Sequence, residues 1–257
     1  MATQHLEQDN ELFEAKQYGD IIFVSFKEIS LLWLGSLKTK QKLLSYFDQI
    51  ERAPSIKVVI LYETHSPRGQ KNYLEFYGLF TKSRIDSDEI LRMCNALDQM
   101  MLSVIQSTKL YILAQSGRTL LPIFTIGFSC DYRIVGDNLV VHNTTPEIDL
   151  PPKGAGGFFL PHIVGPAKTE EILLSGKDMD ADQLLQLKLV DRVVPFDTLK
   201  EAALETAKNY TGQSGVSLAG VKRLVNYSLR DIKSYLQFEN EQLIQLLNVR
   251  KSKSEPM

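Results

Sequence analysis

The chain has little cysteine, little excess charge and no long hydrophobic run. Its two cysteines, Cys94 and Cys130, form no CxxC pair and have no histidine nearby at a metal-binding spacing. We therefore expect two buried structural thiols in a reducing compartment, and no metal site. The 29 basic and 31 acidic residues leave a net charge of -2, which gives no electrostatic reason to expect binding to nucleic acid or to an acidic membrane surface.

We also expect no secretion signal, membrane span, lipid anchor or peroxisomal signal. The stretch MATQHLEQDNELFEAKQ at the N-terminus is polar and acidic, unlike a secretion signal. No run approaches the roughly 18 apolar residues that cross a bilayer, and KSKSEPM at the C-terminus is neither a lipidation nor a peroxisomal signal. We expect a cytoplasmic protein, and 257 residues are enough to bury a sizeable core.

Short β-branched runs alternate with longer segments of helical periodicity, which predicts an α/β fold built from repeated βα units. The strands are expected at residues 21–26, 56–62, 109–114, 132–135 and 190–194. Apolar residues at helical spacing predict helices over residues 39–52 and 88–106.

After residue 197 the strand signal disappears. Helical spacing of apolar residues continues through residues 199–210, 218–229 and 232–247, with a break at TGQSG. We therefore divide the chain into an α/β core over residues 1–196 and a C-terminal helical oligomerisation region over residues 197–257. Such a helical region packs on its own core or on a neighbouring subunit.

Two stretches carry the chemical information. The first, SGRTLLPIFTIGFSCD at residues 116–131, has the form of an entrance to a helix. The second, residues 146–195, contains a carboxylate after a proline, a glycine-rich turn that opens a helix (KGAGG), a helix ending in VG, the turn LLSG, and DADQLLQLKLVDRVVP. Each feature alone is weak evidence, but their order is informative.

In this order the features resemble the enoyl-CoA hydratase/isomerase (crotonase) family. Its corresponding stretch reads PE, a glycine-rich turn, a helix ending in VG, an LTG-like turn, an A-x-x-A-x-x-x-G-L-V segment and a strand ending in proline. The match extends back without a gap from Cys130 and Asp131 to Gly117, and more loosely through the first strands. One departure is Lys188, where the family usually has glycine.

The resemblance implies a crotonase-like spiral of ββα units, followed by a C-terminal helical region that makes trimers, often paired into hexamers. It further implies a substrate that is an acyl-CoA or acyl-carrier thioester, with coenzyme A as part of the substrate and no separate cofactor. We expect a homotrimer or a dimer of trimers, with no nucleic-acid or membrane partner.

Members of this family stabilise an enolate with two backbone N–H groups aimed at the thioester oxygen, where negative charge develops. The resemblance places the first donor at Gln70, which follows Gly69 in the loop THSPRGQKNYLEF. This half of the oxyanion hole is therefore expected to survive.

The second donor is altered. The ungapped match puts Leu121, Pro122 and Ile123 on the family's three glycines, and Thr125 on its first catalytic glutamate. Proline has no backbone N–H, so Pro122 cannot donate, and threonine offers no carboxylate. We expect Pro122 in the first turn of a helix, where a missing N–H is tolerated, with the apolar residues after it facing the core. Alternatively, the N–H of Ile123 faces a ligand oxygen.

The second family glutamate matches Glu147, in the segment PEID. A hydratase needs two carboxylates to hold and split water, whereas double-bond isomerisation needs one base, and decarboxylation is also open. We therefore predict isomerase or lyase chemistry with Glu147 as the catalytic residue, and disfavour hydration. The alternative role of Glu147 is that of a surface or capping carboxylate. Asp149 is a second carboxylate on the same loop, pointing the other way if the backbone is extended.

The remaining pocket candidates are weaker. His142, with Asn143, precedes the PE segment and either lines the pocket or makes a structural hydrogen bond, and His65 lies in the loop before Gly69. Four aromatic residues follow Gln70 and shape either an acyl pocket or a packed lid: Tyr73, Phe76, Tyr77 and Phe80. The three glycines of the turn resemble a phosphate cradle, but the strand and lysine of a P-loop are missing, which favours close helix packing at Gly154, Gly156 and Gly157.

One further hypothesis stays open beside the enzyme. Because Pro122 and Thr125 replace parts of the catalytic machinery, the chain is alternatively a catalytically silent crotonase-fold protein that binds a ligand or serves as an assembly subunit.

Overall fold

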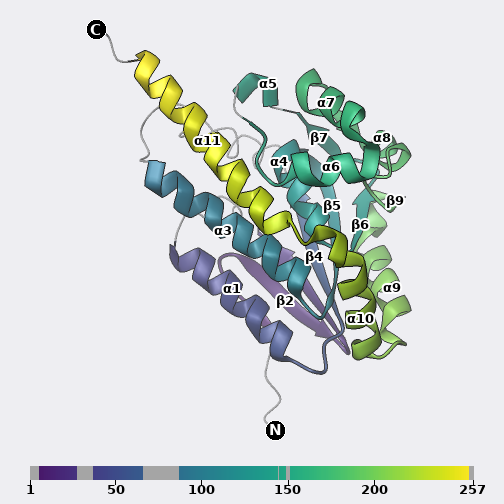
Figure 1. The fold of residues 1–257 in the computed structure, drawn as a ribbon. Helices are drawn as coiled ribbons and strands as arrows, with labels where there is room; N and C mark the ends of the chain where they lie inside the picture. Colours follow the sequence, from purple (N-terminus) through teal and green to yellow (C-terminus); the bar gives the residue numbers. More distant parts are fainter. Residues whose placement is uncertain (1–5, 28–36, 66–86, 144, 149–150, 255–257) are drawn as a thin grey trace.

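The computed structural model describes residues 6–27, 37–65, 87–143, 145–148 and 151–254 (Figure 1). Within them a sheet runs in the order β1-β2-β3-β4-β5-β6-β9, and β7 and β8 extend it from β5. The strands are β1 (Gln8–Asp9), β2 (Phe13–Tyr18), β3 (Ile21–Phe26), β4 (Val58–His65), β5 (Leu110–Leu120), β6 (Tyr132–Gly136), β7 (Val140–His142), β8 (Met179–Asp180) and β9 (Arg192–Val194).

The helices alternate with the strands in the first half and follow them at the end, which confirms the predicted α/β class. They are α1 (Leu37–Arg52), α3 (Ser87–Gln106), α4 (Leu121–Ile126), α5 (Thr145–Ile148), α6 (Gly156–Val164), α7 (Pro166–Ser175), α8 (Ala181–Gln186), α9 (Leu199–Thr211), α10 (Gly215–Asn226) and α11 (Ile232–Ser254). Short 3-10 turns add η2 (Gly127–Ser129), η3 (Phe196–Thr198) and η4 (Tyr227–Leu229).

The central strands are parallel: β3, β4, β5, β6 and β9 pair in this sense, whereas β1, β2 and β3 are antiparallel. Parallel strands covered on both faces are apolar throughout, as in IIFVSF and VVIL. One face, including Val24, Leu61 and Leu113, packs against α1, α3 and α4. The other face, including Ile60, packs against α9.

The predicted strands are all present, but their ends differ. β5 continues through Leu120 rather than ending at residue 114, because its second half pairs with β7. Neither β2 nor β7 is among the predicted strands. β7 has only three residues, and β2 has six that pair along their length with β3. Pairing with β3 therefore supports a strand whose sequence, FEAKQY, has no continuous apolar run.

The last helix lies along α3, in the yellow and blue ribbons of Figure 1. Leu243 and Leu247 of α11 pack against Ile90, Met93 and Cys94 of α3 in a small separate core. α9, by contrast, packs on the sheet itself. The helices after residue 197 thus cover two different parts of the same chain. The division of the chain at residue 196 stays a prediction.

Some simple expectations about composition can be compared with the structure. Cys94 and Cys130 are both free and buried. No helix in the described part of the chain is long and apolar enough to span a membrane. Among the same residues, no three His, Cys, Asp or Glu side chains gather closely enough to hold a metal ion.

A buried polar network joins α11, α3 and the turn before α6. The ammonium group of Lys153 lies 2.7 Å from a carboxylate oxygen of Asp98 and 2.8 Å from one of Glu239. The other oxygen of Glu239 accepts the backbone N–H of Ala155 at 2.9 Å, and Asn240 donates to Asp98 at 2.7 Å. The lysine and both acids are less than a tenth exposed, so the network ties the C-terminal helix to the turn.

The charges in this network depend on one another. Burial alone would lower the pKa of Lys153, but the carboxylates of Glu239 and Asp98 more than offset it, so the pKa lies above its ordinary value. Burial raises the pKa of Glu239, and the Lys153 ammonium offsets this only in part. Since the network holds one more carboxyl than ammonium, removing the lysine leaves two acids without a counterion.

We therefore expect Lys153→Met to lower the free energy of unfolding by about 3–5 kcal/mol, the cost of breaking a buried ion pair by removing one partner. The matched control is Lys168→Met, which removes an exposed ion pair to Glu171 and should change stability by less than about 1 kcal/mol. Urea denaturation followed by circular dichroism measures both. An equal decrease in the free energy of unfolding for the two variants would show that the buried network stabilises the protein no more than the exposed ion pair does.

Candidate active site

Three segments that contain candidate site residues follow the carboxyl ends of neighbouring parallel strands. β4 pairs with β5 so that His65 lies opposite Gly117, and β5 pairs with β7 so that Leu120 lies opposite His142. Since parallel strands end at the same edge of a sheet, the segments after His65, Leu120 and His142 leave from adjacent positions. Ligands of open α/β sheets bind at this kind of edge.

Part of this edge lies outside the described residues. Gly69, Gln70 and the aromatic residues that follow them fall in residues 66–86, and Asp149 falls in residues 149–150. His65 is the last residue of β4. Its side chain lies outside the described part of the structure. The roles assigned to these residues stay predictions.

Helix α4 begins directly after β5. It has six residues, all buried, with a proline in its first turn and no side-chain cap at Leu120, which confirms the expected structural role of Pro122. The first N–H groups of a helix have no acceptor within it. Pro122 has no N–H to offer, so Ile123, the third residue, supplies a backbone donor that the helix itself does not use.

Thr125 does not replace the carboxylate that the resemblance would place there. Its hydroxyl donates to the carbonyl oxygen of Pro122 at 3.1 Å, and the residue is 1% exposed. A Cβ atom at Gly154 would lie 2.9 Å from its Oγ1, and one at Gly156 would lie 3.3 Å from its methyl group. The glycine turn therefore fills the space beside Thr125, so this residue is a packing element of α4.

The glycines of the turn are required by close approach. Gly154 has a φ of +91°, and a Cβ atom there would approach the carbonyl oxygen of Pro122 to 2.3 Å. At Gly157 a Cβ atom would lie 2.4 Å from the hydroxyl of Tyr235 on α11. These contacts confirm the predicted close packing at the start of α6. At Gly154 both the positive φ and the neighbouring backbone oxygen require glycine.

The segment that carries Glu147 is anchored by the residues just before it. The buried side chain of Asn143 donates to the carbonyl oxygen of Ile172 at 2.5 Å and accepts the N–H of Thr145 at 3.3 Å. The ring of Pro146 lies against Gly176, at the end of α7. Glu147 itself belongs to α5, with a side chain outside the described part. Glu147 therefore follows directly after an anchored segment, at the edge described above.

His142 is held by another residue. Its Nδ1 lies 2.5 Å from Asp178, which also lies 3.5 Å from the guanidinium of Arg118. His142 is not among the residues that line the cavity beside α4. This arrangement agrees with the structural alternative for His142, in which it makes a hydrogen bond at the end of β7.

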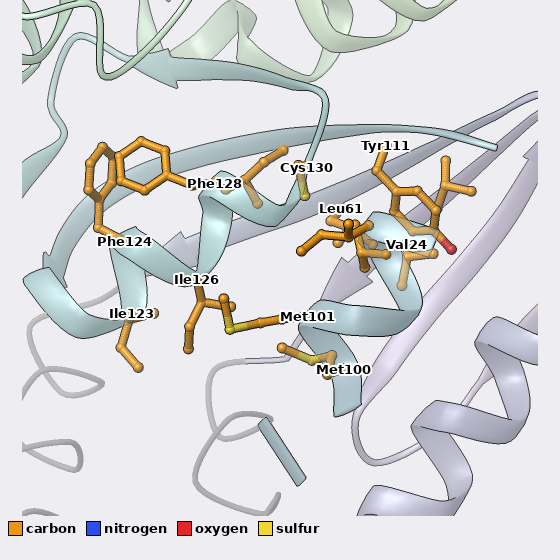
Figure 2. Close-up of a cluster of buried hydrophobic side chains, with 14 of the residues drawn as sticks. Val24, Leu61, Met100, Met101, Tyr111, Ile123, Phe124, Ile126, Phe128 and Cys130 are labelled. Carbon is orange, nitrogen blue, oxygen red and sulfur yellow. The ribbon is translucent and has the colours of Figure 1, made fainter. Parts of the chain in front are cut away.

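A cavity lies between the sheet, α3 and α4. Its walls are mainly apolar, from side chains that include Leu61, Met100, Ile123 and Ile126. Figure 2 shows Ile123 and Ile126 extending from α4 on the side of the two methionines. The space that the centre of a water molecule can reach is about 30 Å³. Because Ile123 is part of the wall, the cavity borders the residue that carries the candidate backbone donor.

Two polar residues in the cavity wall are missing from the sequence prediction. Glu63 and Gln115 lie opposite each other in the register of β4 and β5, and the amide of Gln115 donates to Glu63 at 2.9 Å. Each follows an apolar strand run, at the inward position two residues after Leu61 or Leu113. A polar residue at an inward-facing strand position, directly after an apolar run, is the sequence signal that could have identified both.

The cysteine in the cavity wall is chemically quiet. Burial raises the pKa of the Cys130 thiol to about 12, and burial likewise raises the pKa of Cys94 to about 12. Since the thiolate is the nucleophilic form, neither cysteine is charged near neutral pH. Cysteine chemistry is therefore not what this site offers.

Solved structures of the same fold superpose over nearly the whole chain. An enoyl-CoA hydratase from Bacillus halodurans matches with a TM-score of 0.81 and 20% identity, over 92% of this chain and 95% of that one. A probable enoyl-CoA hydratase from Mycobacterium thermoresistibile matches with a TM-score of 0.76 and 18% identity, over 95% of this chain and 100% of that one. These matches establish the crotonase-like fold.

Curated relatives are similar over a shorter stretch. The probable enoyl-CoA hydratase EchA17 of Mycobacterium tuberculosis is 27% identical over 175 residues, 68% of this chain and 65% of the relative. A carnitinyl-CoA dehydratase of Citrobacter koseri is 27% identical over 101 residues, 39% of each chain. The match to EchA17 thus spans slightly less than two thirds of that protein's length.

The family model described as enoyl-CoA hydratase/isomerase matches residues 36–255. This range includes β4, β5 and β7, the helix α4 that follows β5, and the glycine turn that packs on it. The strand order, the solved structures and the family model therefore agree: the chain belongs to the enoyl-CoA hydratase/isomerase family.

Proposed function

We propose that this protein is an enzyme that binds an acyl-CoA or acyl-carrier thioester and moves a single proton on the acyl group, with Glu147 as the base. The reaction is then of the isomerase type or a related step through an enolate. Family membership supports a thioester substrate, and the curated relatives named above are a probable enoyl-CoA hydratase and a carnitinyl-CoA dehydratase.

The observation that carries the proposal is the pairing of β5 with β7. Leu120 lies opposite His142, so Ile123, three residues after the first, and Glu147, five residues after the second, leave one edge of the sheet. A backbone donor and a carboxylate on adjacent segments are what an enolate needs, since one stabilises the oxygen and the other carries the proton. We assign the second oxyanion donor to the Ile123 N–H, in place of the missing hydrogen at Pro122.

Hydration is disfavoured by the surroundings of Thr125. A hydratase of this family needs a second carboxylate, and the matching position holds a threonine enclosed by Gly154 and Gly156. Losing one acid or base costs about 10²- to 10⁴-fold in rate. A reaction that needs only Glu147 avoids this loss.

We further place the protein in the cytoplasm, because two free, buried cysteines and no disulfide among the described residues suit a reducing compartment. We assign coenzyme A to the substrate and no separate cofactor to the protein. These two assignments, of coenzyme A and of no separate cofactor, follow from the family rather than from a feature of the site.

The assembly is proposed to be a homotrimer or a dimer of trimers. Helix α10 and the turn after it expose five large apolar side chains, at Val216, Val221, Leu224, Val225 and Tyr227. Several large apolar side chains exposed on one short segment are typical of a protein interface. A second copy of this chain is its proposed partner.

The assigned base can be tested at Glu147. Replacing Glu147 by Gln should lower kcat about 10²- to 10⁴-fold on a 3-enoyl-CoA, with little change in affinity, because the amide keeps the shape but cannot take the proton. Steady-state kinetics on 3-enoyl, 2-enoyl and malonyl thioesters measures this. Glu171→Gln, on the exposed face of α7, is the control and should retain full activity.

Calorimetry with CoA and acyl-CoA separates the remaining outcomes. Turnover that survives in Glu147→Gln contradicts the assigned base. Binding without turnover on any thioester would instead favour the catalytically silent protein, and the absence of both binding and turnover would favour an assembly subunit.

The proposed assembly can be tested as well. The wild-type protein should have a mass three or six times that of the 29.1 kDa chain in analytical ultracentrifugation. Leu224→Glu should shift it toward the monomer, because Leu224 is 80% exposed on α10 and a buried charge there would be unpaired. Leu174→Glu, at a site 75% exposed on α7, is the matched control. A monomeric wild type, or a Leu224→Glu variant that stays assembled, contradicts the proposed interface.

A further inference from the structure

Glu63 and Gln115 form a polar floor in the otherwise mainly apolar cavity beside α4. They are paired in register on the parallel strands β4 and β5, so both side chains stand on the same face of the sheet, next to Leu61 and Leu113. Gln115 is 1% exposed. A polar pair at inward positions of two central strands is costly to bury, so its hydrogen bonds must be accounted for.

One hydrogen-bond acceptor of this pair, the side-chain oxygen of Gln115, has no partner among the described residues. The Gln115 Nε2 donates to a carboxylate oxygen of Glu63 at 2.9 Å. This fixes the orientation of the amide, because a carboxylate can only accept. The Oε1 of Gln115 is then buried without a hydrogen-bond partner in the part of the chain that the structure describes. Buried acceptors of this kind are rare in native proteins.

The other polar groups of the cavity do not fill this need. The hydroxyl of Ser129 donates to the carbonyl oxygen of Ile126 at 2.8 Å. The Cys130 thiol is a weak donor at most. The group that completes the floor is therefore a hydrogen-bond donor that comes from outside the described residues.

The size of the cavity limits that donor. Its reachable volume of about 30 Å³ suits one or two water-sized groups. The walls around it are mainly apolar, so a methylene group that carries a hydroxyl, at the end of an acyl chain, fits both the walls and the floor. A water molecule fits the same space, and the experiment below separates the two.

We propose that this cavity holds the far end of the acyl group, and that Glu63 and Gln115 select a thioester whose acyl chain carries a hydroxyl beyond the α and β carbons. Ile123, the residue assigned above to hold the thioester oxygen, is also part of the cavity wall, so a ligand held there has its acyl chain next to the floor. The inference rests on the proposed function, since it names the substrate of the same site.

The floor distinguishes three ends of an acyl chain. A terminal hydroxyl donates to the open acceptor. A terminal methyl group excludes water from Gln115 without replacing its hydrogen bond, which costs binding free energy. A terminal carboxylate brings a negative charge to the Glu63 carboxyl and an acceptor to another acceptor, so it is the least favourable of the three.

The experiment compares three four-carbon thioesters by isothermal titration calorimetry: 4-hydroxybutyryl-CoA, butyryl-CoA and succinyl-CoA. We expect wild-type protein to bind 4-hydroxybutyryl-CoA about 10-fold more tightly than butyryl-CoA, the value of one hydrogen bond to a buried polar pair. We expect succinyl-CoA to bind more weakly than either.

Two variants and a control assign the preference to the floor. Gln115→Leu should bind butyryl-CoA at least as well as 4-hydroxybutyryl-CoA, because the open acceptor is gone. Glu63→Gln should improve the binding of succinyl-CoA relative to wild type. Tyr62→Phe removes a hydroxyl on the opposite face of the same strand, where Tyr62 packs with the second core, and should leave the order of the three affinities unchanged. Circular dichroism confirms that each variant is folded.

The outcomes separate this inference from the proposed function. If the three thioesters bind with equal affinity, the floor holds only water and the inference is wrong while thioester binding stands. The inference is also wrong if Gln115→Leu keeps the wild-type preference. If neither these thioesters nor CoA bind, the proposed function fails, and the selectivity of the pocket fails with it.

Discussion

The carbonyl oxygen of Pro122 lies so close to Gly154 that a Cβ atom at position 154 would approach it to 2.3 Å. The site depends on this contact, because it presses α4 and the turn before α6 together and encloses Thr125 between them. Pro122 and Thr125 are therefore suited to this place. Pro122 has no N–H that needs an acceptor, and the Thr125 hydroxyl donates to a carbonyl oxygen of its own helix. The space beside α4 that could hold a second carboxylate is taken up by packing.

The turn is held from its other side as well. Lys153 and Ala155, the neighbours of Gly154, both bond to Glu239 of α11, and Lys153 also bonds to Asp98 of α3. Buried ionic groups are tolerated only in a fixed geometry with every partner in place. The docking of the C-terminal helix and the shape of the turn are consequently one structural unit, so a change in α11 is transmitted to the turn that packs against Pro122.

The sequence predicts the fold well and the site only in part, for physical reasons. Continuous apolar runs identify the buried parallel strands, and Pro122 identifies the first turn of α4. The glycine turn and the PE segment carry the family resemblance. The pairs Glu63–Gln115 and Lys153–Glu239 could not be predicted, because strand register and helix docking bring together residues that are 52 and 86 positions apart. The weak strands β2 and β7 depend on partners in the same way.

The central claim is that the N–H of Ile123, and not the residue at position 122, holds the thioester oxygen. Nuclear magnetic resonance of protein labelled with ¹⁵N-isoleucine tests it directly, with the Ile123 signal assigned by an Ile123→Val variant. On titration with an acyl-CoA, the account predicts a downfield shift of the Ile123 amide proton that saturates with binding, while Ile134, buried in β6, is unaffected. Saturating binding with no change at Ile123 would contradict the account.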